Sequence, residues 1–327
     1  MAKQYRIKRK IGTMQIAAGS FGTLDLPRQY DYESLMLRIS ASLQVTVLAT
    51  SVRAEAPCQL VPRIEVIADG KNTIYSAPFW FASLGNLRRP ITESGARATT
   101  PPSGVAVATY AVEAIGIIDL QTVDGVRPKD SNFRTRGLSL LQLRLTYANA
   151  GDAFVGGTVA YSGTPVVDVF SAECVEETDD AGNFLTSPIA LKKVSYQQQA
   201  FAASNSAAEF RLPAGNMIRS VFVRTDGTTT AGEPSTTPLN NLQLLSGVDV
   251  RLNLSGPMLR AENNANFGQV VAGYYLADML SKGGYNVNLT DLWDVTRQAE
   301  PKAILDMNGA ANVQVQVVTT EYILAAA

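Results

Sequence analysis

The residue types that most often carry catalysis are sparse in this chain, and histidine is absent from it. Histidine is the usual general base near neutral pH and the commonest metal ligand. Its absence excludes nucleophilic catalysis by a Ser-His-Asp or Cys-His arrangement. The two cysteines, Cys58 and Cys174, match no zinc-binding or redox spacing. The sequence favours two free thiols and leaves a disulfide open.

Carboxylates are the remaining groups that could do chemistry, because glycoside hydrolysis needs only two acids at a suitable distance. Asp278 and Asp291 form such a pair on paper, but any chain with 29 acidic residues offers many pairs. The chain has no glycine-rich phosphate loop, nucleophile elbow or zinc motif. We therefore expect no enzyme, no cofactor and no metal centre with catalytic chemistry.

An acidic run over residues 176–182 could hold calcium through its carboxylate oxygens. It lacks the alternating spacing and the central glycine of an EF-hand loop, so a solvated linker is the favoured interpretation. A structural calcium ion stays open.

Basic residues gather in the first ten positions, at Lys3, Arg6, Lys8, Arg9 and Lys10. We interpret residues 1–10 as an arm that is ordered only against a partner, with a solvated tail as the alternative. The formal net charge of the whole chain is only −1, which argues against a nucleic-acid-binding protein. The sequence predicts neither a signal peptide nor a membrane-spanning segment, because no long apolar run follows the basic residues or occurs elsewhere.

A pattern near the start of the chain occurs twice. Leu24-Asp25-Leu26-Pro27 returns 186 residues later as Phe210-Arg211-Leu212-Pro213. A second echo closes each half, where residues 167–173 match residues 315–321 and both segments end in glutamate. Two echoes in the same order predict a duplicated domain rather than a solenoid. We divide the chain into a basic arm (1–10), a first domain (11–175), an acidic linker (176–190) and a second domain (191–327).

Strict alternation of apolar and polar residues marks the strands, as at Leu35, Leu37 and Ile39. Turn-type residues separate many such runs, and helical spacing is rare. The predicted fold class is all-β, with two tandem jelly-roll β-sandwiches and a minor helical content. The best helical spacing lies over residues 269–282, where we predict a helix.

The densest aromatic cluster is Phe79, Trp80 and Phe81. We predict that these side chains anchor a core or a subunit contact, and a ligand platform is the alternative. Three long excursions without periodicity, at residues 88–104, 119–137 and 226–238, are expected to be loops that make contacts.

This layout resembles the double jelly-roll major capsid proteins of tailless icosahedral phages with an internal membrane, such as corticoviruses and tectiviruses. The resemblance rests on the tandem β-units, on turns that recur in both of them and on two features of the second unit. These features are the Leu-Pro turns (Leu26-Pro27, Leu212-Pro213), the glycine turns (Asp69-Gly70, Ser246-Gly247), the helix expected at 269–282 and the final Glu321-Tyr322.

The resemblance implies a structural protein of the virion, assembled in the host cytoplasm. Three copies would form a pseudo-hexagonal homotrimeric capsomer, and its partners would be neighbouring capsomers, minor capsid and vertex proteins and the inner viral membrane. The basic arm would face that membrane, and there would be no direct reading of nucleic acid.

Two other functions stay open. One is a minor capsid, vertex or spike protein of the same kind of virion, which copy number in purified particles would distinguish. The other is a carbohydrate-binding β-sandwich protein, which a glycan array would test.

Overall fold

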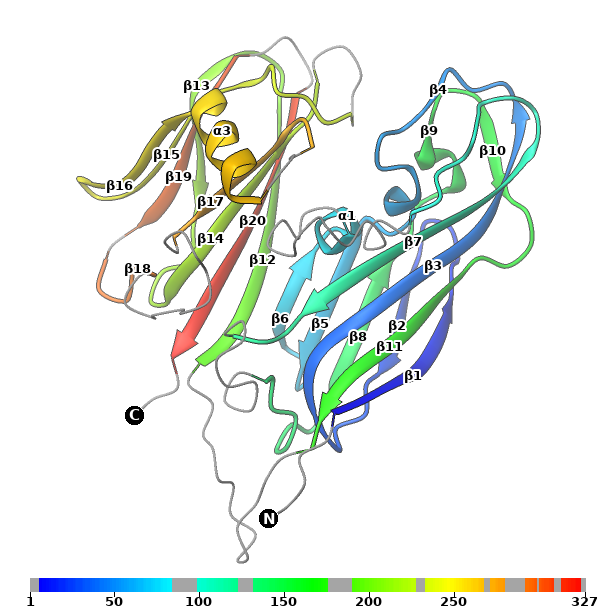
Figure 1. Cartoon of the computed structure of the whole chain (residues 1–327), viewed down its shortest axis with the longest axis horizontal. Coiled ribbons are helices and arrows are strands. Elements are labelled where there is room, and N and C mark those ends of the chain that lie inside the picture. The colour runs from blue at the N-terminus through cyan, green and yellow to red at the C-terminus, as the bar shows by residue number, and fades with distance from the viewer. Residues whose placement is uncertain are drawn as a thin grey trace, which may run out of the picture. The chain divides into compact units, whose positions relative to one another are not determined.

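The computed structural model describes residues 6–83, 99–122, 132–175, 190–227, 233–267, 271–279, 292–298, 300–308 and 313–324. Within these residues the chain divides into two compact units, of which unit 1 extends to Lys192 and unit 2 begins at Lys193 (Figure 1).

Unit 1 is built from two antiparallel sheets. Its strands are β1 (Arg6–Gln15), β2 (Phe21–Asp25), β3 (Asp31–Val47), β4 (Ser51–Val52), β5 (Arg63–Ala68), β6 (Asn72–Ala77), β7 (Thr109–Asp119), β8 (Leu141–Thr146), β9 (Phe154–Val155), β10 (Thr158–Tyr161) and β11 (Val166–Cys174). Its helices in the described residues are α1 (Phe79–Ser83) and the 3-10 turns η1 (Ala56–Leu60) and η3 (Ala150–Ala153). One sheet has the order β1-β11-β3-β7, with β10 paired to the last residues of β3, and the other has the order β2-β8-β5-β6. The short strands β4 and β9 pair with each other.

Unit 2 repeats this plan. Its elements are β12 (Ala190–Phe201), β13 (Asn205–Arg211), β14 (Met217–Thr225), β15 (Leu239–Ser246), β16 (Asp249–Ser255), α3 (Gly256–Phe267), β17 (Tyr274–Asp278), β18 (Trp293–Asp294), β19 (Pro301–Met307) and β20 (Val313–Leu324). One sheet has the order β12-β20-β14-β17, with β18 also paired to β14, and the other has the order β13-β19-β15-β16.

The two units have the same topology, strand for strand. The strands correspond in chain order. Strands β1, β2 and β3 correspond to β12, β13 and β14, strands β5, β6 and β7 to β15, β16 and β17, and strands β8 and β11 to β19 and β20. With this correspondence the sheets of the two units have the same strand order. A helix follows the equivalent strands β6 and β16 in both units. Eight strands in two packed sheets with these connections form a jelly roll. The predicted fold class, two tandem jelly rolls, is confirmed.

The two sequence echoes pair with each other inside each unit, and the register is the same. Val169 lies opposite Leu37 in unit 1, and the equivalent residues Val317 and Val223 lie opposite each other in unit 2. Both ladders then contain a register shift at the same place, just before the glutamate that ends the second echo. A β-bulge redirects the side chain beside it, so the duplication extends to a local irregularity.

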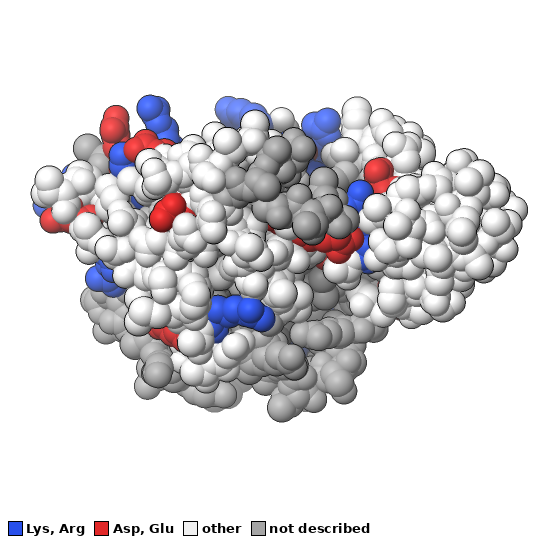
Figure 2. Space-filling view, turned by 90° about the horizontal axis from the view of Figure 1, so that it is seen from above, with Lys and Arg blue, Asp and Glu red and all other residues white. Residues whose placement is uncertain are grey.

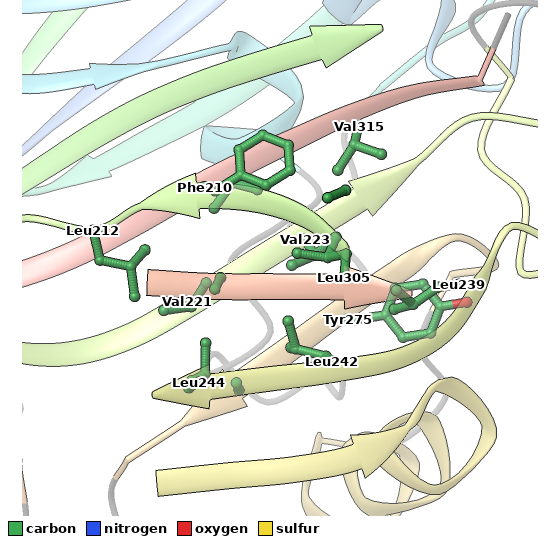
Figure 3. Close-up of a cluster of buried hydrophobic side chains, with 14 of the residues drawn as sticks. Phe210, Leu212, Val221, Val223, Leu239, Leu242, Leu244, Tyr275, Leu305 and Val315 are labelled. Carbon is green, nitrogen blue, oxygen red and sulfur yellow. The ribbon is translucent and has the colours of Figure 1, made fainter. Parts of the chain in front are cut away.

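Each unit has its own core between its two sheets. In unit 2, Figure 3 shows apolar side chains from β13, β15 and β19 facing those from β14, β17 and β20. In unit 1 the alternating residues Leu35, Leu37 and Ile39 of β3 are fully buried. Each such side chain contributes about 1.5–3 kcal/mol when it is removed from water, so alternation along the strands fixes which face packs inward.

The predicted helix over residues 269–282 is wrong. Residues 274–278 form strand β17, which pairs with β14, and Tyr274, Tyr275 and Ala277 are almost fully buried. A short strand that is buried on both faces shows a continuous apolar run, which periodicity cannot separate from a helix. Gly273, with φ of +80°, also stops a helix from passing through this segment.

The helix of unit 2 lies instead at α3, directly after β16. Pro257 stands in its first turn, where proline is well tolerated because the first N–H groups have no partner within the helix. Within this helix Leu259 and Asn263 are buried. The narrow buried stripe explains why apolar spacing did not reveal it.

The predicted extent of the basic arm also needs correction. Strand β1 begins at Arg6, which lies opposite Cys174 of β11, so at least half of the predicted arm belongs to the first sheet. The basic side chains hid the alternation of exposed and half-buried residues along this strand. The predicted linker lies outside the described residues except for Ala190, where β12 begins.

Candidate functional site

Most of the basic residues predicted to face a membrane form ion pairs within unit 1. Arg6 pairs with Glu33, and the Arg9 Nη2 lies 3.0 Å from Glu173 Oε2. The Lys10 Nζ lies 2.6 Å from Asp168 Oδ1. Lys8 is exposed on the same strand, and Lys3 lies outside the described residues. Ion pairs within the fold therefore neutralise part of the positive charge of residues 6–10.

Glu173 is a buried charge at the bulge between β11 and β3. Its residue is 1% exposed, and its carboxylate accepts hydrogen bonds from Arg9 and from the Ser171 hydroxyl at 2.5 Å. Burial, followed by the negative charge of Glu173, raises the pKa of the neighbouring Tyr32 well above its usual range. A buried carboxylate needs such partners because an unpaired one would be strongly destabilising.

Glu321 is the equivalent residue of unit 2, and it is 0% exposed. The Lys193 Nζ of β12 lies 3.2 Å from Glu321 Oε1, and the Asn216 amide donates to Oε2 at 2.5 Å. In both units a cation of the first strand thus meets a buried glutamate of the last strand. The repeated pair joins the two ends of each unit's chain.

Further buried charges in unit 2 are also held by protein partners. Arg224 pairs with Asp226, and both side chains are at least 98% buried. The Arg219 Nη1 donates to the Tyr322 hydroxyl at 2.7 Å and lies over its ring. The buried charges of β14 are thus paired with protein groups nearby in the fold.

The aromatic cluster belongs to α1, which packs against β7. Phe79 is fully buried and Trp80 is 3% exposed, whereas Phe81 is half-buried. A side chain at Gly116 of β7 would come within 3.1 Å of the Phe79 ring, so this glycine makes room for the helix. Phe79 and Trp80 therefore lie in the interior of unit 1, and a subunit contact through Phe81 stays a prediction.

Both cysteines are buried and free, as the sequence favoured. Burial, assisted by the charge of Glu55, raises the pKa of the Cys58 thiol to about 12. A thiol that stays protonated is a poor nucleophile, so Cys58 has the character of a core residue.

Among the described residues, no group of three or more His, Cys, Asp or Glu side chains is placed to hold a metal ion. No helix in the same residues is long and apolar enough to cross a membrane. Asp291, the acidic run at 176–182 and parts of the three predicted contact loops (88–98, 123–131 and 228–232) lie outside the described part of the chain.

The sequence matches no family model and no curated protein. The fold, in contrast, matches solved structures over nearly the whole chain. The major capsid protein of Sulfolobus turreted icosahedral virus aligns with a TM-score of 0.73 and 16% identity, covering 99% of this chain and 97% of that one. The major capsid protein of bacteriophage PM2 aligns with a TM-score of 0.62 and 12% identity, covering 98% of both chains. The capsid of the virus PBCV-1 gives a TM-score of 0.67 at 12% identity, covering 98% of this chain and 94% of that chain.

Proposed function

We propose that this chain, which has the double jelly-roll fold of viral major capsid proteins, builds the shell of a virus particle. The observation that carries the proposal is the duplication, because both units repeat one strand order, one register and one bulge. Three copies of a chain with two similar units present six similar corners, which suits a pseudo-hexagonal capsomer in an icosahedral shell. The function is assembly, and no catalytic step is assigned to it.

The composition supports a protein that is largely covered by its neighbours. Charged residues make up only 17% of the chain and apolar residues 46%. Obligate subunit interfaces bury on the order of thousands of Å² and are depleted in charge. In this proposal the partners are other copies of the chain, and minor capsid and vertex proteins complete the shell.

The direct test is the mass of the purified protein in solution, measured by light scattering after size exclusion, with and without calcium. We expect a stable species near three times 35.0 kDa. A monomer at every concentration would contradict the capsomer. A mass that depends on calcium would assign the ion a structural role at an interface.

An internal membrane below the shell is the further part of the proposal. It is supported by Lys3 and Lys8, since Arg6, Arg9 and Lys10 are used by ion pairs within unit 1. Each basic residue near an anionic lipid surface contributes about 1 kcal/mol. Lys3→Glu combined with Lys8→Glu should weaken binding to anionic vesicles, with zwitterionic vesicles as the control. Unchanged binding would remove the membrane from the proposal.

A further inference from the structure

Three segments at one end of unit 1 contain no charged residue. Residues 39–52, 99–112 and 153–167 contain no Asp, Glu, Lys or Arg, although 17% of the whole chain is charged. The fold brings these three segments together, because β10 pairs with the end of β3 and β4 pairs with β9. Residues 99–112 join these two segments, because the Val45 and Ala49 amides donate hydrogen bonds to the carbonyls of Ala108 and Val105. We call this region the uncharged end.

The uncharged end exposes large apolar side chains. Val47 is 56% exposed, Leu48 is 62% exposed and Val107 is 65% exposed. Figure 2 shows the corresponding lobe, at the β4, β9 and β10 end of unit 1, with no Lys, Arg, Asp or Glu atoms over its visible outer part. Such a surface is unusual for a protein face in water, where mixed charges maintain solubility.

The described residues of unit 2 contain no counterpart of this region. The residue equivalent to Ile39 is Thr225, and β14 ends there, whereas β3 continues to Val47. In unit 1 the connection from β8 to β11 contains β9 and β10. In unit 2 the equivalent connection, from β19 to β20, is only residues 308–312. Beyond Ile39, the uncharged end is therefore an addition to the strand pattern that the two units share.

The side chains of this surface favour a protein partner. Subunit interfaces are depleted in charged residues at their centre and enriched in apolar area. Gly, Ala, Ser, Thr and Val also lose little rotamer freedom when they are covered, in contrast to Lys, Arg and Glu. A nucleic acid or an anionic lipid surface would require cations, and these three segments supply none.

We propose that the uncharged end is covered by another copy of this chain. A lightly charged surface suits a lightly charged partner, and only 17% of the residues of this chain are charged. The inference rests on the proposed function, in which other copies are the most abundant partners, and it assigns one subunit contact to a defined surface.

The test places a charge on this surface without touching the core. Leu48→Glu and Val107→Glu, alone and together, each alter a side chain that is more than half exposed. Val248→Glu is the matched control, because Val248 is 95% exposed in unit 2, outside the uncharged end. Thermal unfolding of each variant checks that it is folded, and light scattering over a dilution series measures its assembly.

We expect the double variant to need more than about tenfold higher concentration for half-assembly, because an unpaired charge in a contact is strongly unfavourable. The control variant should assemble like the wild type. If the wild type assembles and the folded double variant does so equally well, the inference is overturned while the proposed function stands. A wild-type protein that never assembles would overturn both.

Discussion

Glu173 and Glu321 show how much of this molecule is decided by single residues. Each ends a sequence echo, each follows a register shift, and each is buried against a cation from the first strand of its unit. The sequence showed that the two glutamates match, but not that they are buried. Arg9 is 164 residues away from Glu173 in the chain, and no local pattern could connect them.

Breaking the ion pair between Lys193 and Glu321 of unit 2 should lower the free energy of unfolding by a measurable amount. Lys193→Met removes the partner of Glu321 and leaves a carboxylate that is 0% exposed with one amide donor. We expect the free energy of unfolding to fall by about 1–3 kcal/mol. The value stays below that of a fully buried pair because the Lys193 side chain is 37% exposed. Urea denaturation measures the change.

Lys302→Met is the matched control, since Lys302 pairs with the half-exposed Glu209 at 2.7 Å. An exposed ion pair contributes less than about 1 kcal/mol. Equal losses in the two variants would show that burial of Glu321 does not matter. The double variant Lys193→Met with Glu321→Gln should recover part of the loss, because it removes the buried charge.

The lowered pKa of Asp168 predicts how acid affects the pairing of β1 with β11. A hydrogen bond from Lys10, and then one from Thr13, hold the pKa of Asp168 below its usual value. A lowered pKa in the folded state contributes stability above the unfolded-state pKa of about 3.9, and this contribution is lost as the pH falls through the folded-state pKa. Wild-type stability should therefore fall more steeply below about pH 4 than that of Asp168→Asn. Parallel curves of urea midpoint against pH for the two proteins would contradict this.

At the scale of elements, the strands were largely predictable and the helices were not. Alternation at Leu35, Leu37 and Ile39 identified β3, because one face of a half-buried strand packs on the core. The two echoes identified equivalent strands, which pair in the same register. The prediction failed at β17, where burial on both faces removed the alternation, and at β1, where basic residues concealed it.

Helix α1 provides the test at this scale. Phe79→Ala should lower the free energy of unfolding by about 3–5 kcal/mol, because it empties a fully buried position facing Gly116. Phe81→Ala, two residues along the same helix, should cost clearly less because Phe81 is only half-buried. Chemical denaturation distinguishes the two variants, and a larger loss for Phe81 would contradict this account of the aromatic cluster.

At the scale of the whole molecule, the strand order that the two units share and the extension that only unit 1 shows among the described residues support different parts of the proposal. In the proposed function, the shared strand order of the two units would let one chain supply two similar corners of a capsomer. The extension of unit 1 beyond the common jelly roll supplies the uncharged end. The sequence revealed the duplication through short echoes. It did not reveal the uncharged end, because that surface is assembled from three segments far apart in the chain.

The most direct test of the capsid assignment is electron cryomicroscopy of particles assembled from this chain. The account predicts an icosahedral shell whose capsomers show six jelly-roll lobes from three copies, with β3 and β14 in equivalent positions around each capsomer. A shell in which the chain occurs only at the vertices, or purified chains that form no regular assembly, would contradict it.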